Sequence, residues 1–341
     1  SAVQVEHHAT RNSAGIFDES SFAKARITGA RAAEFLNYLC ANNVVKGVGR
    51  TVYTQALNSR GGIESDYTVT QVSDSEFFIV TGTAFATHDF GWLKKIAHEK
   101  NYDVMIKDIT QELACFGIWG PRARDILSKV TSYDLSHSNF PFMHSRLLEI
   151  AGKAVRMTRI TYVGELGYEI YTDADMALKL WDTLLEAGKE FGIIPAGRGA
   201  FNSMRLEKGY RSYGTDMTSE HNPHEAGLAF SVRKGGGYIG AEAFEALDPA
   251  AISRKLVCLV FENPEHVVMG KEPVFVNGSP VGYTTSSYFG HSIGKQIAYA
   301  WLPIDHTTLG TQVTVKYFDS MYSAVVSDDP QFDPSMSRLR S

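Results

Sequence analysis

The segment 63–70 carries side chains that can exchange protons, at a spacing that gathers them on one face of a predicted strand. Alternation along a strand sends Ile63, Ser65, Tyr67 and Val69 one way and Glu64, Asp66, Thr68 and Thr70 the other. The second face is unusually polar, so it either meets bulk water or lines a polar pocket. The pair Gly61-Gly62 just before it favours the pocket slightly, because a backbone without side chains allows close approach.

Glu165 stands between two glycines in the stretch Gly164-Glu165-Leu166-Gly167, which we interpret as a loop between strands. Such a carboxylate can be an ordinary turn residue at the surface. It can also accept two parallel N–H groups from a flat heterocycle, a geometry in which ionised acceptors bond strongly. The local pattern leaves both interpretations open.

Arg198 and Arg205 are seven residues apart, which places both on one face of a predicted helix, two turns from each other. Arginines in this setting usually pair with local acids such as Glu207. They can equally present positive charge to an anionic ligand.

Metal, dinucleotide, nucleic-acid and membrane sites have little support. The histidines His7, His8, His221 and His224 lack metal-site helical spacing, and Gly235-Gly236-Gly237 lacks the strand and spacing of a dinucleotide loop. The three cysteines lie far apart, as expected of free thiols in a reducing cytosol. The 33 basic and 38 acidic residues leave a net charge of −5 without a basic block, and apolar runs are too short to span a bilayer. We therefore predict a cytoplasmic protein without metal, nucleic acid or membrane.

The spacing of apolar residues predicts a mixed α+β fold. In the first half we expect a strand over 16–28, a helix over 32–40, an antiparallel meander of strands at 52–57, 63–72 and 77–80, and a helix over 85–100. Short strands follow at 104–106 and 113–118. Gly120-Pro121 then opens a helix, with proline at its first position.

Further along we expect a hairpin through Ala151-Gly152-Lys153, a strand at 168–171, an amphipathic helix over 176–191 and a helix over 198–208 that ends at Gly209. From about residue 255 only short strands follow, with Asn277-Gly278 as a strong hairpin turn. This pattern predicts a small barrel or sandwich. We expect a domain boundary near residue 250, between regions 1–250 and 251–335.

In this order the motifs resemble the folate-dependent aminomethyltransferases, the family of the glycine-cleavage T-protein. They are Gly15-Ile16-Phe17-Asp18, the segment 58–66, Tyr162-Val163-Gly164-Glu165-Leu166-Gly167-Tyr168-Glu169, the segment 197–209 and Val281-Gly282-Tyr283-Thr284-Thr285-Ser286. The T-protein loop usually has a threonine where Val163 stands. This difference, together with the segment 206–217, favours the branch formed by the C-terminal folate domains of bacterial dimethylglycine oxidase and of the dimethylglycine and sarcosine dehydrogenases.

The resemblance implies a three-lobed α+β fold, with two intertwined lobes around a folate channel and a C-terminal β-barrel. It also implies that Asp66 is the catalytic acid near N10 of tetrahydrofolate and that Glu165 grips the pterin. Leu166 and Gly167 share that loop, and Thr68 and Arg198 match folate contacts. Arg205 is added as a folate contact only from its helical spacing.

The implied reaction captures the methyl-derived carbon of an N-methylated amine such as dimethylglycine, as an iminium or formaldehyde, and yields 5,10-methylenetetrahydrofolate. A flavin oxidase domain or subunit would supply that carbon, with FAD in the partner and not in this chain. The absence of an initial methionine leads us to expect either a trimmed chain or a piece of a longer polypeptide. Two alternatives stay open: a sulfonium, methoxy-aromatic or amine-oxide donor, or a non-catalytic folate-binding module.

Overall fold

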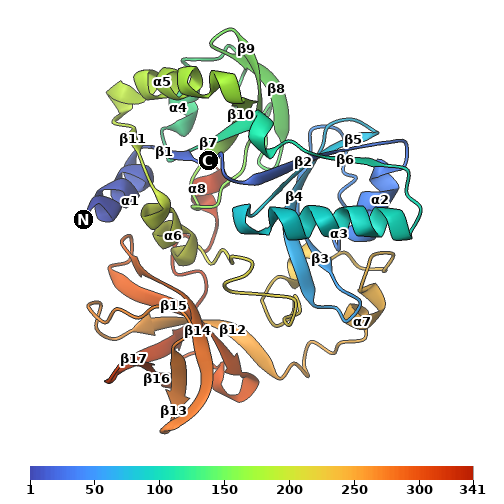
Figure 1. Ribbon diagram of the computed structural model, residues 1–341. Helices are drawn as coiled ribbons and strands as arrows, with labels where there is room; N and C mark the ends of the chain where they lie inside the picture. Colours follow the sequence, from blue (N-terminus) through green and yellow to red (C-terminus); the bar gives the residue numbers. More distant parts are fainter. Residues whose placement is uncertain (341) are drawn as a thin grey trace.

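Three lobes make up the chain, and each is built around its own β-sheet (Figure 1). The computed structural model describes residues 1–340. One lobe holds a six-stranded sheet, the second a five-stranded sheet and the third a closed six-stranded barrel. The predicted α+β fold with a C-terminal barrel is therefore confirmed.

The five-stranded sheet has the order β3-β4-β5-β2-β6. Its strands are β2 (Ala23–Thr28), β3 (Thr51–Leu57), β4 (Ile63–Gln71), β5 (Glu76–Thr81) and β6 (Met105–Asp108). Strands β3, β4 and β5 form the predicted antiparallel meander. Helices α2 (Ala32–Leu39) and α3 (Ala86–Glu99) pack their apolar residues with Tyr67, Val69, Phe77 and Ile79 of the sheet. One face of this sheet is thus covered, and the polar residues of β4 lie on the other.

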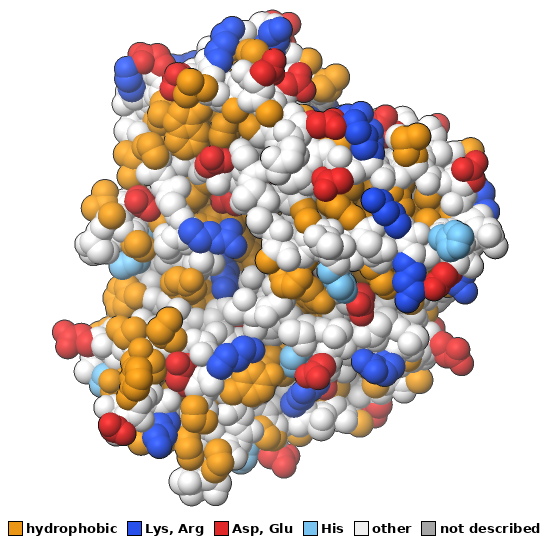
Figure 2. Space-filling model, in the orientation of Figure 1, with side chains coloured by type: hydrophobic (Ala, Val, Ile, Leu, Met, Phe, Trp, Pro, Cys, Tyr) orange, Lys and Arg blue, Asp and Glu red, His pale blue; other side chains and the backbone are white. Residues whose placement is uncertain are grey.

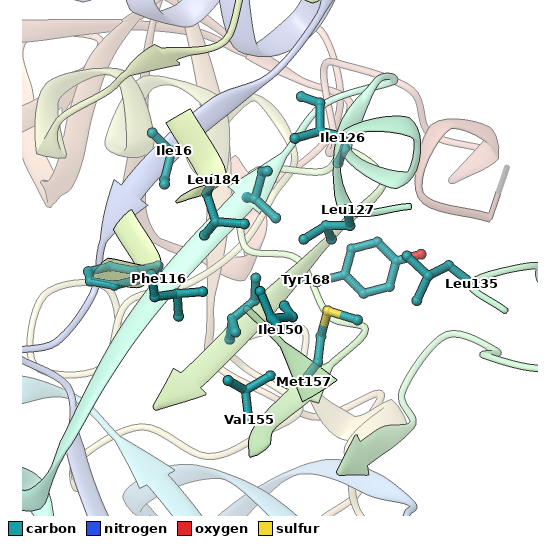
Figure 3. Close-up of a cluster of buried hydrophobic side chains, with 14 of the residues drawn as sticks. Ile16, Phe116, Ile126, Leu127, Leu135, Ile150, Val155, Met157, Tyr168 and Leu184 are labelled. Atoms are coloured by element: carbon teal, nitrogen blue, oxygen red, sulfur yellow. The ribbon is translucent and has the colours of Figure 1, made fainter. Parts of the chain in front are cut away.

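The six-stranded sheet has the order β11-β1-β7-β10-β9-β8. Its strands are β1 (Gly15–Asp18), β7 (Leu113–Trp119), β8 (Ser145–Ile150), β9 (Lys153–Thr158), β10 (Gly167–Asp173) and β11 (Ile194–Pro195). Helices α4 (Ala123–Leu127) and α5 (Ala177–Gly188) supply apolar side chains to one core with Tyr168 and Ile170 of β10. Figure 3 shows Leu184 of α5 and Tyr168 pointing into this core.

The expected single strand over 16–28 is wrong, because the chain leaves one sheet at Asp18 and enters the other at Ala23. A turn in which the Phe22 amide donates to the Glu19 carbonyl separates β1 from β2. The residues alternate on both sides of this turn, so their pattern alone does not reveal the crossing. The crossing brings the two sheets together, and Phe22 packs against the cluster between them.

Helices α1 (Ala2–Asn12) and α6 (Arg198–Glu207) pack against each other, and α6 also contacts the barrel. Helix α6 and the following Gly209, whose φ is +76°, match the prediction. Helix α1 was not predicted, since its sequence is mostly polar. The sequence predicted Pro121 at the first position of a helix. That prediction is wrong, because helix α4 begins at Ala123 and Pro121 lies in the preceding turn.

The barrel closes in the order β12-β15-β14-β13-β16-β17. Its strands are β12 (Arg254–Phe261), β13 (Pro273–Val276), β14 (Ser279–Gly290), β15 (Lys295–Pro303), β16 (Gln312–Tyr317) and β17 (Ser320–Ser327). Asn277 and Gly278 take φ of 50° and 78° and form the predicted tight turn between β13 and β14. The short helices α7 (Ala241–Glu245) and α8 (Ser337–Arg340) were not predicted.

Positive and negative side chains are interspersed on the face shown in Figure 2. Among residues 1–340 the longest helices are too short or too polar to cross a bilayer. The C-terminal helix α8 returns to the middle of the molecule in Figure 1. There its residues meet the loop that contains Glu165.

Candidate functional site between the two sheets

The polar face of β4 lies against the six-stranded sheet and not in bulk water. The alternation predicted for this strand is confirmed, since Ser65, Tyr67 and Val69 are fully buried on the apolar side while Asp66 and Thr68 are half-buried on the other. Thr68 pairs with Val80 of β5, which shares a cluster with Tyr171 of β10. Phe78 of β5 also meets Tyr171, edge to face, with ring centroids 4.9 Å apart. These contacts place the face of Asp66 opposite β10.

Asp66 is held by its neighbours on β3. The hydroxyl of Tyr53 donates to Oδ2 of Asp66 at 3.1 Å, and Gln55 lies directly opposite Asp66 in the strand register. Burial raises the pKa of Asp66 to about 7, and the nearby charge of Asp89 adds to this rise, while the hydrogen bond from Tyr53 opposes it. A carboxyl group that titrates near 7 can both accept and return a proton at neutral pH.

Glu169 of β10 lies on the face of the six-stranded sheet that is turned toward the five-stranded sheet. Its neighbours Tyr168 and Ile170 point into the core under α4 and α5, so alternation turns Glu169 and Tyr171 toward the five-stranded sheet. The hydroxyl of Tyr171 donates to Oε2 of Glu169 at 2.5 Å. Burial raises the pKa of Glu169, and the hydrogen bond from Tyr171 opposes the rise.

Glu19 and Arg198 stand beside Glu169. Nη1 of Arg198 lies 3.8 Å from Oε2 of Glu19, and the guanidinium group stacks 4.8 Å from the ring centre of Phe201. Burial raises the pKa of Glu19 to about 8; the charge of Glu169 also raises it and that of Arg198 lowers it. Arg198 is 62% exposed at the start of α6. It therefore offers a cation next to two buried acids.

Tyr162 contributes an aromatic surface to this region. It stacks on Phe201 and on Tyr210, with ring centroids at 5.1 and 5.7 Å, and its hydroxyl donates to the carbonyl of Arg211. Burial raises the pKa of Tyr162, and the charge of Asp66 adds to the rise. The half-buried ring thus lies within the electrostatic reach of Asp66.

Glu165 is tied into a different network. Its oxygens accept hydrogen bonds from Arg11 at 2.9 Å and from Arg338 at 2.8 Å, and its side chain is 1% exposed. Burial raises its pKa while both arginines oppose the rise. Arg11, Arg338 and Glu165 also border a cavity of about 480 Å³.

Leu166 and Gly167 fix the course of this loop. Leu166 is buried in the core under α4 and α5. A Cβ atom at Gly167 would lie 2.3 Å from the carbonyl oxygen of Ile118, so only glycine fits there. The structure gives both residues a packing role.

Arg205 joins α6 to the barrel. Its guanidinium group donates to Oδ2 of Asp216 at 2.7 Å and to the hydroxyl of Ser286 at 2.5 Å, and the side chain is nearly fully buried. Asp216 also accepts from Thr285 at 2.6 Å. The two arginines predicted to share a helix face therefore diverge in environment: Arg198 is largely exposed near Glu19, and Arg205 is enclosed.

Of the residues selected from the sequence, the structure brings Asp66 and Thr68 onto one face and places Glu165 and Arg205 in separate ionic networks. Sequence reasoning missed Tyr53, Glu19 and Tyr162. Tyr53 could have been found from the meander, because it pairs with Thr68, two residues from Asp66 on the same face of β4. Glu169 stood within the motif that carried Glu165, and strand alternation alone would have set it apart from Tyr168.

Among the described residues, 1–340, no group of three or more His, Cys, Asp or Glu side chains is arranged to hold a metal ion. Cys40, Cys115 and Cys258 are buried free thiols. The side chains gathered between the sheets are instead carboxyl, phenol and guanidinium groups. These groups are suited to an organic ligand with ring nitrogens and a negative charge.

Comparison with known families covers both parts of the chain. The GCVT N-terminal domain matches residues 1–235, and the glycine cleavage T-protein C-terminal barrel domain matches residues 254–333. The chain belongs to the glycine-cleavage T-protein family. The resemblance seen in the sequence is thereby confirmed, and with it membership of a family that binds tetrahydrofolate and carries out folate-dependent one-carbon transfer.

Relatives of this chain include amine dehydrogenases, an amine oxidase and aminomethyltransferases. Human mitochondrial dimethylglycine dehydrogenase is 36% identical over 95% of this chain and 38% of its own length. The 4-methylaminobutanoate oxidase (formaldehyde-forming) of Paenarthrobacter nicotinovorans is 37% identical over 99% of this chain and 41% of its own length. The aminomethyltransferase of Thermoanaerobacter sp. strain X514 is 36% identical over 91% of this chain and 84% of its own length.

The family fold is also seen in a solved structure. The glycine cleavage system aminomethyltransferase T from Bartonella henselae superposes with a TM-score of 0.88, at 27% identity, over 99% of this chain and 90% of that one. The chain spans about two fifths of the length of the dehydrogenase and oxidase relatives that it matches.

Proposed function

We propose that this chain transfers the methyl-derived carbon of an N-methylated amine, such as dimethylglycine, to tetrahydrofolate and so forms 5,10-methylenetetrahydrofolate. The observation that carries the proposal is Asp66, a half-buried carboxyl group with a pKa of about 7 on a face turned toward β10. The choice of donor is supported by relatives named for dimethylglycine dehydrogenation and for formaldehyde-forming oxidation of 4-methylaminobutanoate.

The residues between the sheets fit a reduced folate. Asp66 and Glu169 offer carboxyl oxygens to N–H groups, Tyr162 offers a ring surface, and Arg198 offers a cation to a carboxylate. The side-chain amide nitrogen of Gln55, opposite Asp66, is buried and has no hydrogen-bond partner among residues 1–340. A buried donor without a partner is costly, and a bound heterocycle can satisfy it.

Asp66 would act on protons during carbon transfer. Tetrahydrofolate supplies the nucleophilic nitrogens when bound, and these must lose protons as they bond to carbon. With a pKa near 7, Asp66 accepts a proton at neutral pH and can return it. The hydrogen bond from Tyr53 to Oδ2 holds the carboxyl group in place. General-base assistance of this kind contributes a factor of about 10² to 10⁴ in rate.

A carboxylate that binds the pterin ring needs an oxygen that is free to accept hydrogen bonds from it. Glu165, assigned to the pterin by resemblance, has both oxygens bonded to arginines, so we propose that it supports the ligand only by holding its loop. Glu169, four residues on, lies on the face of β10 that is turned toward the five-stranded sheet, and it is the carboxylate we propose for the ring. Thr68 and Arg198 complete the contacts, while Arg205 acts by joining α6 to the barrel.

The donor is tested with the purified chain, tetrahydrofolate and one carbon source at a time. Formaldehyde, and the iminium released by a flavin amine oxidase acting on dimethylglycine, should give methylenetetrahydrofolate faster than the spontaneous reaction. A sulfonium, methoxy-aromatic or amine-oxide donor that reacts when these two do not would move the chain to another demethylase. Folate binding without acceleration from any donor would make it a non-catalytic module.

We also propose that a flavin oxidase domain or subunit works beside this chain, because its dehydrogenase and oxidase relatives extend well beyond the matched region. The labile carbon would then pass directly to the folate. Trapping with a formaldehyde scavenger tests this: a scavenger should compete poorly when oxidase and this chain are associated, and fully when they are separate.

A further inference from the structure

His88 and Asp89 at the start of α3 form a charged group next to Asp66. The two nitrogens of the His88 ring face two carboxylates: Nδ1 lies 2.9 Å from Oδ1 of Asp89, and Nε2 lies 3.1 Å from Oε1 of Glu64. Ionised carboxylates only accept hydrogen bonds, so both contacts are made together only when both ring nitrogens carry hydrogen. The geometry therefore favours the imidazolium form of His88.

Asp89 is fastened to the strand of Asp66. Thr81 at the end of β5 donates to Oδ2 of Asp89 at 2.5 Å, and the same hydroxyl oxygen lies 3.3 Å from the backbone carbonyl oxygen of Asp66. Asp89 is fully buried, whereas His88 is 46% exposed. The histidine thus connects solvent with a buried acid adjacent to Asp66.

Glu64 places a second acid near Asp66. It lies two residues earlier on β4, on the same face, and its backbone carbonyl accepts a hydrogen bond from Tyr213. His88 therefore lies between Asp89 and Glu64, within hydrogen-bond distance of both.

We propose that His88 and Asp89 are positioning residues that set the proton affinity of Asp66, with the imidazolium of His88 balancing the charges of Asp89 and Glu64. The inference rests on the proposed function, because it matters only if Asp66 exchanges a proton during turnover. Neither residue needs to touch the folate or the carbon donor.

The other titratable groups around Asp66 come from β3, from the segments that carry Tyr162 and Tyr213, and from the facing six-stranded sheet, which brings Glu169 and the neighbouring Glu19. Tyr53 of β3 donates directly to Asp66, and the phenols of Tyr162 and Tyr213 feel its charge. All three phenols have pKa values raised by burial, so they stay neutral around pH 7. The acids Glu19 and Glu169 on the facing sheet have pKa values raised by burial, to about 8 for Glu19, and both are left unchanged in the variants below.

Removing either member of the pair has opposite consequences for Asp66. Asp89→Asn deletes a negative charge, which eases ionisation and lowers the pKa of Asp66. His88→Gln deletes the balancing positive charge and leaves two acids uncompensated, which raises it. Each change should move the titration by about 0.5 to 1 in pH, as a unit charge does at short range under partial solvent screening.

Two measurements test whether His88 and Asp89 shift the titration of Asp66. The first is the titration of Asp66 in the folded chain by carboxyl ¹³C NMR, with the signal assigned by its loss in Asp66→Asn. The second is the acid limb of the pH profile of kcat/KM for methylenetetrahydrofolate formation. Glu99→Gln and His98→Gln, at the far end of α3, replace an acid and a histidine at exposed positions and should leave both readouts unchanged.

The expected result is a shift to lower pH for Asp89→Asn and to higher pH for His88→Gln. A titration of Asp66 that stays in place in His88→Gln, or moves the same way in both variants, overturns the inference. His88 is half-exposed, so its variant should fold even where Asp89→Asn does not. The NMR readout needs no turnover: shifts in a chain without transferase activity would refute the proposed function and leave the pairing intact.

Discussion

The hydroxyl of Tyr53 on β3 donates a hydrogen bond to Oδ2 of Asp66 on β4, which lies two residues from Thr68, the register partner of Tyr53. This bond fixes the orientation of Oδ2, and Oδ1 does not take part in it. It also favours the ionised form of Asp66 and so limits the rise in pKa that burial causes.

Tyr53→Phe should therefore raise the pKa of Asp66. A hydrogen bond to a charged group contributes about 1.5 to 3 kcal/mol, which corresponds to about one to two pH units at full strength, and partial exposure lowers the effect toward one. The acid limb of the kcat/KM profile should move to higher pH, with little change in folate affinity. An unmoved limb would show that the phenol does not act on the titrating acid.

Asp66→Asn should stabilise the fold more at pH 8 than at pH 5. The pKa of Asp66 is about 7 when folded, against a usual value of 3.8. Ionisation is disfavoured in the folded state, so the penalty is absent at low pH, grows as pH rises above the unfolded pKa and levels off above 7. Urea unfolding of wild type and variant at both pH values measures this, and an equal gain at both would contradict it.

Glu165→Gln and Glu169→Gln should separate support from ligand contact. Glu165→Gln removes one of the two buried anionic partners of Arg11, so it should lower stability by about 2 to 3 kcal/mol. The loss is smaller than for an isolated buried pair, because Glu207 still faces Arg11 and Arg338 is partly exposed. Folate affinity, measured by calorimetry on the folded variant, should stay close to wild type.

Glu169→Gln should instead weaken folate binding by about one to two powers of ten, the loss expected for a charged hydrogen bond, with a smaller effect on stability. The reverse outcome, weak binding in Glu165→Gln and normal binding in Glu169→Gln, would return the pterin to Glu165. The pair serves as its own control, since both substitutions remove one charge from neighbouring positions.

Arg205→Met should destabilise the chain by about 3 to 5 kcal/mol, because it leaves Asp216 buried without its cation. The exposed pair of Arg31 and Glu34 gives a matched control, and Arg31→Met should cost less than about 1 kcal/mol. Denaturant unfolding compares the two. Similar losses in both variants would show that Arg205 does not hold α6 to the barrel.

The sequence predicted the structure best where a local pattern, such as the two-residue alternation of a strand, determines the whole segment. Alternation placed Asp66 and Thr68 on one face of β4, and the Asn277-Gly278 turn located a hairpin of the barrel. It failed where tertiary contacts decide. The crossing at Glu19 interrupts a continuous alternating pattern, and the polar helix α1 is stabilised by packing on α6.

The candidate site shows the same limit. Arg338 lies 173 residues from Glu165, and no local pattern reveals that pairing. Glu165 and Glu169 are the same residue type in one motif, and only the packing of Tyr168 and Ile170 into the core turns Glu169 toward the five-stranded sheet. His88 likewise has one carboxylate partner on its own helix, Asp89, and a second on strand β4, Glu64, which lies 24 residues earlier in the chain.

The most direct test of Asp66 compares wild type with Asp66→Ala for two quantities measured side by side. The first is the thermal shift with tetrahydrofolate, where ligand at 100 times its dissociation constant adds about 2.7 kcal/mol of stability. The second is the rate of methylenetetrahydrofolate formation above the spontaneous reaction. We expect the variant to keep the thermal shift and to lose a factor of about 10² to 10⁴ in rate. A variant that forms product as fast as wild type, or a wild type that tetrahydrofolate does not stabilise, would contradict the account.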